Sequence, residues 1–187
     1  MVYKLRADRA HYLNFYISPD EIEAKLGDYF LLDEPLWYEF WQPVEASFQD
    51  DSDKKDVVTP PDISIWHSSN NLAFNQKAYD ALKEELAPYG EWLPVSCEGN
   101  PYWLLHTTKK IEMEAVDLKN SVRTIDEGDF IDLEKLTFKD DAVKDLLIFQ
   151  TPYSGYRNLY CTDKFKTLVE DAGLKGLIFS EDLISIL

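Results

Sequence analysis

The sequence predicts an α+β fold, with a mixed, largely antiparallel sheet and about three helices. Three segments combine a helix cap with apolar residues at helical spacing, and they begin at Ser18, Asn75 and Thr162. Several shorter segments alternate apolar and polar residues, which is typical of half-buried strands. Hydrophobic residues make up 45% and aromatic residues 14% of the chain, which is enough for a packed core and argues against disorder.

The N-terminal segment predicts one strand that leads into one helix. Residues 13–17 alternate apolar and polar positions, and we expect this strand to pair with residues 3–6. Ser18 followed by Glu21 is a capping-box pattern, and Gly27 is suited to the end of a helix. We therefore expect a short helix directly after the strand.

The middle of the chain predicts a strand, a helix and a hairpin. Residues 62–66 place two isoleucines on one strand face, and residues 76–86 carry an apolar helix stripe behind the N-cap Asn75. Residues 93–106 predict a β-hairpin, because turn-forming residues separate two apolar strands. Pro94 cannot donate a hydrogen bond to a neighbouring strand, so we expect it on an edge strand or beside a bulge.

The C-terminal half predicts further strands and the third helix. Residues 111–115 alternate apolar and acidic side chains, which indicates a strand with one wet face. Residues 126–145 are less regular and offer only short strand candidates, at 130–133 and 136–138. The most regular part predicts a strand at 158–161, a helix after a cap at Thr162 or Asp163 that ends at Gly173, and a buried strand at 177–179.

We predict a single domain over residues 1–187, because this length is within the usual range of one domain. An N-terminal subdomain over residues 1–56 is the alternative organisation. Residues 72–93 and 159–178 share the order strand, cap, helix, turn, strand. This similarity is consistent with a faint internal repeat and equally with the general frequency of such units.

Charge and cysteine content restrict the possible partners. The chain has 35 acidic and 19 basic residues, a net charge of -16, which repels nucleic acid and favours encounter with a basic protein. Acidity that serves solubility alone is the alternative explanation. Cys97 and Cys161 stand far apart in apolar surroundings, which indicates reduced, buried thiols. No segment resembles a signal peptide or a membrane span, so we expect a cytoplasmic protein.

Patterns that indicate catalysis or cofactor binding are missing from the sequence. His11, His67 and His106 lie in separate segments without metal-ligand spacing, so we predict no metal site. Ser154 lacks the preceding glycine of a nucleophile elbow, and no glycine-rich phosphate loop is present. We therefore predict no cofactor and no catalytic residue. A small enzyme that uses His67 or His106 with scattered carboxylates remains the alternative.

An aromatic stretch and an acidic stretch follow each other between residues 33 and 56. Buried aromatic anchors carry much of the binding energy in protein interfaces, while charged rims steer association. The sequence therefore predicts partner-binding residues here: Trp37, Tyr38, Asp50, Asp51 and Asp53. The alternative is that the rings fill the core, which we expect for Trp41 and Trp66.

Five short segments occur in an order that resembles a known family. They are PDI at 61–63, LAFN at 72–75, WLPV at 92–95, AVDLKNS at 115–121 and DAGLKGLIF at 171–179. Together they resemble an immunity-protein family of bacterial polymorphic toxin systems, formerly described as a domain of unknown function. The family-like region covers residues 60–187, and the fourth and fifth segments are the most specific.

This resemblance implies an α+β fold without catalytic residues, a toxin gene nearby, and neutralisation of that toxin by direct binding. Our leading hypothesis is therefore an immunity protein that inhibits a cognate bacterial toxin, which the charge leads us to expect to be basic. The alternatives are a small hydrolase or transferase and a regulatory binding module that has no toxin. The resemblance says nothing of residues 1–56.

Overall fold

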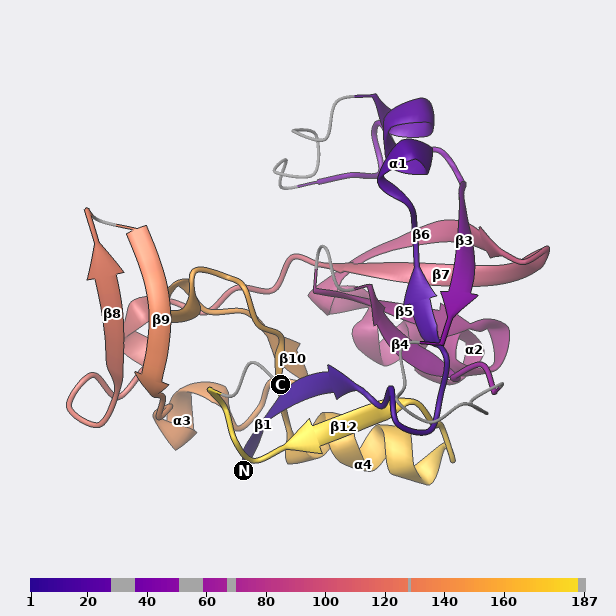
Figure 1. The fold of residues 1–187 in the computed structure, drawn as a ribbon. Helices are drawn as coiled ribbons and strands as arrows, with labels where there is room; N and C mark the ends of the chain where they lie inside the picture. The colour runs from indigo at the N-terminus through magenta and orange to yellow at the C-terminus, as the bar shows by residue number, and fades with distance from the viewer. Residues whose placement is uncertain (28–35, 51–58, 67–69, 128, 185–187) are drawn as a thin grey trace.

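The computed structural model describes residues 1–27, 36–50, 59–66, 70–127 and 129–184 (Figure 1). The fold is α+β with mixed, mostly antiparallel sheets, as the sequence predicts. Three helices in the described residues are seven residues or longer: α1 (Pro19–Leu26), α2 (Gln76–Leu86) and α4 (Asp163–Asp171). None of the described helices is long and apolar enough to span a membrane.

Six strands form a nearly closed barrel in the order β2-β3-β6-β7-β5-β4, and its two edge strands approach each other. Only β3 and β6 pair in parallel, and the other pairs are antiparallel. The strands are β2 (Asn14–Tyr16), β3 (Val44–Gln49), β4 (Ile63–Trp66), β5 (Asn71–Asn75), β6 (Gly90–Cys97) and β7 (Asn100–Thr107). Aromatic and aliphatic side chains such as Phe15, Trp66 and Leu104 fill one buried cluster of this barrel.

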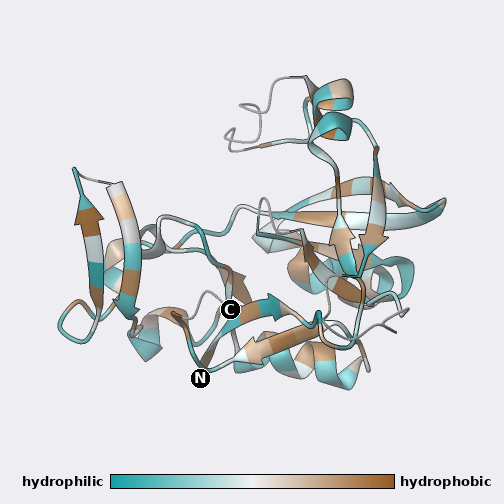
Figure 2. Ribbon diagram, viewed as in Figure 1, coloured by the Kyte–Doolittle hydropathy of each residue, from teal (hydrophilic) through white to brown (hydrophobic). Residues whose placement is uncertain are grey.

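Four further strands form an antiparallel sheet in the order β10-β11-β1-β12. They are β1 (Val2–Ala7), β10 (Ile148–Phe149), β11 (Tyr160–Thr162) and β12 (Leu177–Ser180). Tyr3 and Leu5 of β1, Leu82 of α2 and Phe165 of α4 share one core cluster, which joins this sheet to the barrel. Hydrophobic segments, brown in Figure 2, follow the strands of both sheets.

The two helical units that resemble each other in sequence also share a topology. α2 connects β5 to β6, and β7 lies between these two strands. α4 connects β11 to β12, and β1 lies between them. Both units are therefore split strand-helix-strand arrangements, and both helices contribute to the same core.

The predicted helix caps are confirmed, because they depend on residues close in sequence. Asn75 accepts a hydrogen bond from the Ala78 amide at 2.9 Å, and Thr162 accepts one from the Lys164 amide at 3.3 Å. Ser18 caps α1, but the Glu21 carboxylate accepts from the Glu45 amide of β3 at 2.9 Å. The second half of the capping box therefore ties α1 to the barrel.

Two strand predictions are wrong. β2 pairs with β3 of the barrel, whereas residues 3–6 belong to β1, whose two sides are occupied by β11 and β12. Residues 111–115 form no strand, and Met113–Ala115 is a 3₁₀ turn. Ile111 and Ala115 are nevertheless buried. A segment with a 3₁₀ turn can thus bury the apolar residues of an alternating sequence without forming a strand.

The predicted hairpin is confirmed as β6 and β7, joined by Glu98 and Gly99, which both have positive φ. The prediction for Pro94 is wrong in one respect, since β6 is an interior strand. Pairing of β6 with β3 begins only at Val95. Pro94 lies just before this stretch, so its missing backbone N–H costs no hydrogen bond to β3. β12 is an edge strand and only partly buried, with Ile178 41% exposed.

The remaining described elements form a smaller unit around β10. They are the hairpin β8 (Val122–Asp126) and β9 (Asp129–Lys135), the short helix α3 (Asp140–Val143), and 3₁₀ turns at Met113–Ala115 and Pro152–Ser154. A further 3₁₀ turn, Ala87–Tyr89, connects α2 to β6 instead. Leu133, Phe149 and Tyr153 belong to the third core cluster, which holds this unit together. Figure 1 shows the hairpin on the side of the molecule away from the barrel.

Candidate functional site

The predicted partner-binding residue Trp37 lies inside a stack of rings. Its indole ring is 2% exposed and stacks on His106 at 3.9 Å between ring centroids, with Trp41 stacked at 6.0 Å. The Glu91 carboxylate accepts from the Trp37 amide at 2.8 Å and lies 2.9 Å from Nδ1 of His106. This arrangement fixes the segment before β3 against β6 and β7.

The pair of His106 and Glu91 is the arrangement closest to a catalytic one among the described histidines. Burial lowers the pKa of His106, although its hydrogen bond to Glu91 opposes that shift. Both side chains are nearly buried, at 11% and 13% exposure, and Trp37 covers the imidazole face. The second Glu91 oxygen accepts from the Tyr38 amide. The geometry therefore favours structural support over proton transfer.

The structure separates the other predicted site residues. Tyr38 is 60% exposed next to Trp37, in a turn that comes before β3 begins at Val44. Asp50 is exposed directly after the last residue of β3. Six strand residues lie between the two ends, a separation of roughly 17 Å. Asp51 and Asp53 lie outside the described residues, as does His67. The described residues thus keep Trp37 with Tyr38 and place Asp50 at the other end of the strand.

Trp41 and Trp66, for which we expect core positions, have different environments. Trp66 is 1% exposed, which confirms the expectation. Trp41 is only partly buried, and its indole N–H donates to the Pro94 carbonyl at 2.9 Å. Trp37 is therefore the buried ring of this pair, and Trp41, which we expect in the core, is the partly exposed one. Trp37 is buried because it stacks directly on His106.

The hairpin β8–β9 presents a surface that the sequence patterns do not predict. Leu118, Val122 and Ile125 are 56%, 47% and 46% exposed. Residues 122–135 carry five acidic and two basic side chains. No strand pairs with the outer edge of β8 in the part of the chain that the structure describes. Exposed apolar residues beside a free strand edge are typical of a protein-binding surface.

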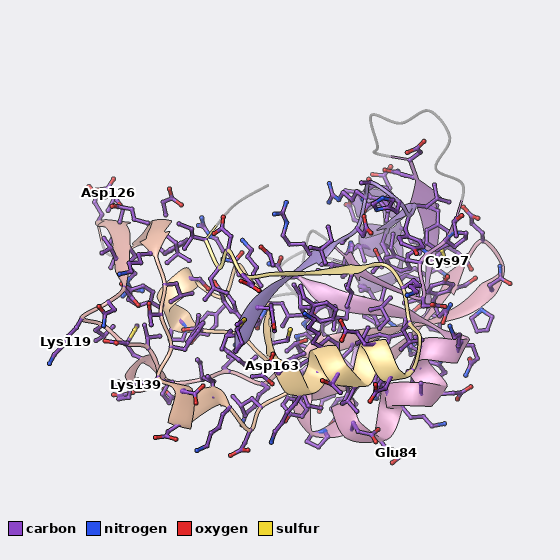
Figure 3. All side chains as sticks on the ribbon, turned by 90° about the horizontal axis from the view of Figure 1, so that it is seen from below. Glu84, Cys97, Lys119, Asp126, Lys139 and Asp163 are labelled. Carbon is purple, nitrogen blue, oxygen red and sulfur yellow. The ribbon has the colours of Figure 1, made fainter. Side chains whose placement is uncertain are left out.

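The hairpin projects from the body and is fastened at its base (Figures 1 and 3). The Arg123 guanidinium donates to the carbonyls of Pro152 and Tyr153 at 3.2 Å and lies 4.5 Å from the Tyr153 ring. Figure 3 shows Lys119 near the base and Asp126 at the tip, both pointing outward. We name Leu118, Val122, Ile125 and Asp126 the hairpin surface.

The fourth family-like segment, residues 115–121, builds the turn before the hairpin. Asp117 accepts from the Lys119 amide at 3.1 Å and from the Asn120 side chain at 2.7 Å. These hydrogen bonds lower the pKa of the Asp117 carboxyl. The Ser121 hydroxyl accepts from the Thr137 amide at 2.9 Å, which closes the hairpin base. Asp117, Asn120 and Ser121 of this segment therefore have a structural role.

The fifth family-like segment, residues 171–179, ends α4 and fixes β4. The Leu174 amide donates to Val169 and the Gly173 amide to Glu170, which is the predicted Schellman ending. The Lys175 carbonyl accepts from the Asp62 and Ile63 amides at 2.9 and 3.0 Å. This segment also has a structural role, since it joins the four-stranded sheet to the barrel.

The remaining groups with chemical potential are buried or dispersed. Cys97 and Cys161 are free and buried, as expected, and burial raises the pKa of the Cys97 thiol to about 12. Raised thiol pKa values oppose nucleophilic chemistry near neutral pH. Among the described residues, no group of three or more His, Cys, Asp or Glu side chains could hold a metal ion.

A family model matches part of the chain. Residues 91–182 match the model of the immunity protein family Imm11, which spans β6 to β12 and includes the hairpin. The first two segments of the resemblance, at 61–63 and 72–75, lie before the matched residues. No curated protein matches the chain. Residues 91–182 of this chain are therefore similar to the Imm11 immunity protein family.

Proposed function

We propose that this chain is an immunity protein that binds a cognate toxin in the cytoplasm and neutralises it by direct contact. The family match over residues 91–182 carries this proposal. Two buried, unbonded cysteines support a reducing compartment. The covered pair of His106 and Glu91 and the structural roles of the fourth and fifth family-like segments support an inhibitor that is not itself an enzyme.

The hairpin surface is the contact surface that we propose first. It lies within the family-matched residues, contains three exposed apolar side chains and has a free strand edge in the part that the structure describes. Apolar anchors supply affinity in protein interfaces, and a free edge can accept an added strand. The acidic hairpin and the net charge of -16 favour a basic patch on the toxin.

The predicted residues form our second proposed surface. Tyr38 is its exposed anchor, and the buried ring of Trp37 holds that segment in place. Asp50 with Asp51 and Asp53 would steer a basic partner from the far end of β3. This surface lies outside the matched residues, so it would serve recognition of one particular toxin.

Neutralisation is tested by co-expression with the product of the gene adjacent to the one that encodes this chain. We expect that product to stop growth when expressed alone, and this chain to restore growth and to be retained with it in a pull-down. Restored growth without a complex, or a toxic product that this chain neither binds nor inhibits, contradicts the proposal.

Binding kinetics of the purified complex separate the two surfaces. Replacing Val122 and Ile125 by Ser should speed dissociation about tenfold, because exposed apolar anchors act mainly on the dissociation rate. Ile178→Ser removes an equally exposed apolar group on β12 and is the matched control. Tyr38→Ala tests the second surface in the same way.

Charge reversal gives an independent readout for each surface. Asp126→Lys on the hairpin, or reversal of Asp50, Asp51 and Asp53, should slow association a few-fold at low salt and much less at high salt. Glu84→Lys on the exposed side of α2 is the control, and its charge change equals that of Asp126→Lys or of any single reversal at Asp50, Asp51 or Asp53. If the variants of one surface associate at the same rate as Glu84→Lys, that surface is not part of the interface.

A further inference from the structure

A cleft of about 670 Å³ is lined by basic side chains from two separate parts of the chain. Lys4, Arg6 and Arg9 come from β1 and the residues after it, and Arg157 comes from the segment before β11. Asp132 of β9 is the one acidic side chain among the described lining residues. The cleft lies outside the surfaces considered above, and neither His11 nor His106 lines it.

The sign of the charge in this cleft is opposite to that of the whole chain. Acidic residues outnumber basic ones by 35 to 19 overall, yet the cleft lining has four basic residues and one acidic residue. A long-range field from a net charge of -16 disfavours any anion. An anion that binds here must therefore be held by contacts with the cleft residues. Measured anion binding would then indicate this site, because the charge of the whole chain repels anions.

Lys4 and Arg6 lie on the same face of β1, two residues apart on an interior strand. Lys4 is only 8% exposed, and burial lowers its pKa, to which the positive charge of Arg6 contributes. Asp182 acts in the opposite direction. Two like charges at adjacent same-face positions cost free energy, and an anion between them would offset that cost.

The rest of the lining suits the less polar part of a ligand. Leu5, Leu133, Leu159 and the Phe130 ring also line the cleft. The Arg157 guanidinium lies over the Phe130 ring, 5.3 Å from its centroid. A flat aromatic face beside a guanidinium plane can receive a planar ring by stacking. The lining thus combines a cationic part with an apolar, aromatic part.

We propose that this cleft binds a phosphorylated small molecule with a planar ring, of the size and chemistry of a nucleoside diphosphate. Its volume lies within the roughly 300–1,000 Å³ of small-molecule sites. Arg6, Arg9 and Lys4 hold the phosphates, since guanidinium groups bind phosphate oxygens in pairs. Phe130 and Arg157 receive the ring. The ligand site is independent of the proposed toxin contact and needs no covalent step.

Isothermal titration of the full chain with ADP tests the proposal, with inorganic phosphate and adenosine as the two partial probes. We expect ADP to bind, inorganic phosphate to bind more weakly, and adenosine to bind weakly or not at all. ADP affinity should fall as salt rises, because the contacts are charged. Binding should also slow amide exchange in β9, because Phe130 and Leu133 form one wall.

Variants locate the binding. Arg6→Gln and Arg157→Gln should each weaken ADP binding about tenfold or more, the usual effect of losing a charged hydrogen bond or stacking partner. Lys139→Gln removes one positive charge from an exposed position outside the lining and should leave the affinity unchanged. Arg157 is exposed, so its replacement leaves the fold intact, which circular dichroism checks.

Three outcomes overturn the proposal. The first is absence of ADP binding at millimolar concentration, and the second is equal weakening by Lys139→Gln and Arg157→Gln. The third is binding of a hexaglutamate peptide without binding of ADP, which would assign the cleft to an acidic protein segment. None of these outcomes bears on toxin neutralisation, which the growth assay measures separately.

Discussion

Gly176 is a position where an added side chain would meet both a positive φ and a close backbone neighbour. Its φ is +116°, and a Cβ at this position would lie 2.2 Å from the Ile63 carbonyl oxygen. The neighbouring backbone cannot move freely, because the Lys175 carbonyl bonds to the Asp62 and Ile63 amides. The glycine of the fifth family-like segment thus allows α4 and β12 to approach the start of β4.

We predict that Gly176→Ala lowers the free energy of unfolding by about 3 kcal/mol or more, through strain and backbone overlap. Gly173→Ala is the matched control, since Gly173 also has positive φ but nothing within 4 Å of an added Cβ. That control should lose only about 1 kcal/mol. Urea unfolding measures both, and equal losses would show that contact with Ile63 is unimportant.

His106 predicts a pH dependence of stability. Burial lowers the pKa of His106 in the folded protein, whereas the pKa of histidine in an unfolded chain is about 6.5. As pH falls below about 6.5, the unfolded chain binds a proton that the folded chain resists. The stability contributed by neutral His106 is therefore complete above that pH and is lost as pH falls through the lower folded pKa.

We expect His106→Gln to reduce the loss of unfolding free energy between pH 7 and pH 5, although the variant is less stable at pH 7 because the stack with Trp37 is lost. His11→Gln removes a ring that is 66% exposed and is the control. Chemical unfolding at both pH values measures the difference. An unchanged slope for His106→Gln would assign the pH dependence to other groups.

At the scale of elements, the hairpin β8–β9 depends on a small number of contacts with the body. Arg123 contributes two hydrogen bonds to carbonyls and a ring contact with Tyr153. Leu133 and Phe130 pack into or against the third core cluster. A two-stranded sheet is only marginally stable alone, so these contacts determine how firmly the hairpin surface is held.

We predict that Arg123→Gln speeds amide hydrogen exchange in residues 122–135 about tenfold, because charged hydrogen bonds to the body are lost. Exchange in β6 and β7 should stay unchanged, since no contact of Arg123 reaches the barrel among those described here. Lys119→Gln, at the outward-pointing base, is the control. Equal exchange in all three proteins would mean that Leu133 alone holds the hairpin.

At the scale of the whole molecule, charge of opposite sign is placed on different surfaces. The acidic hairpin and the end of β3 face solvent, whereas four basic side chains share one cleft. A basic toxin and a phosphorylated ligand would therefore be directed to separate regions. Because β9 lines the cleft and also belongs to the hairpin, occupancy of one region can alter the rigidity of the other.

Local features of the fold could be predicted from the sequence. The caps at Asn75 and Thr162, the end of α4 at Gly173 and the turn of the β6–β7 hairpin all match the structure. Each depends on residues within a few positions of one another, whose backbone preferences hold in any surroundings. The family-like segments at 115–121 and 171–179 could be recognised for the same reason, because each contains a turn or helix end that depends on neighbouring residues.

Only the tertiary structure decided the strand partners, the burial of Trp37 and the composition of both candidate sites. β2 pairs with β3 across a long separation in sequence, and β8 lacks the alternation that marks a half-buried strand. Trp37 is buried because His106, 69 residues away, supplies its stacking partner. Such contacts depend on which surfaces meet in the folded chain. Local sequence preferences do not determine this, because they act only between residues close in sequence.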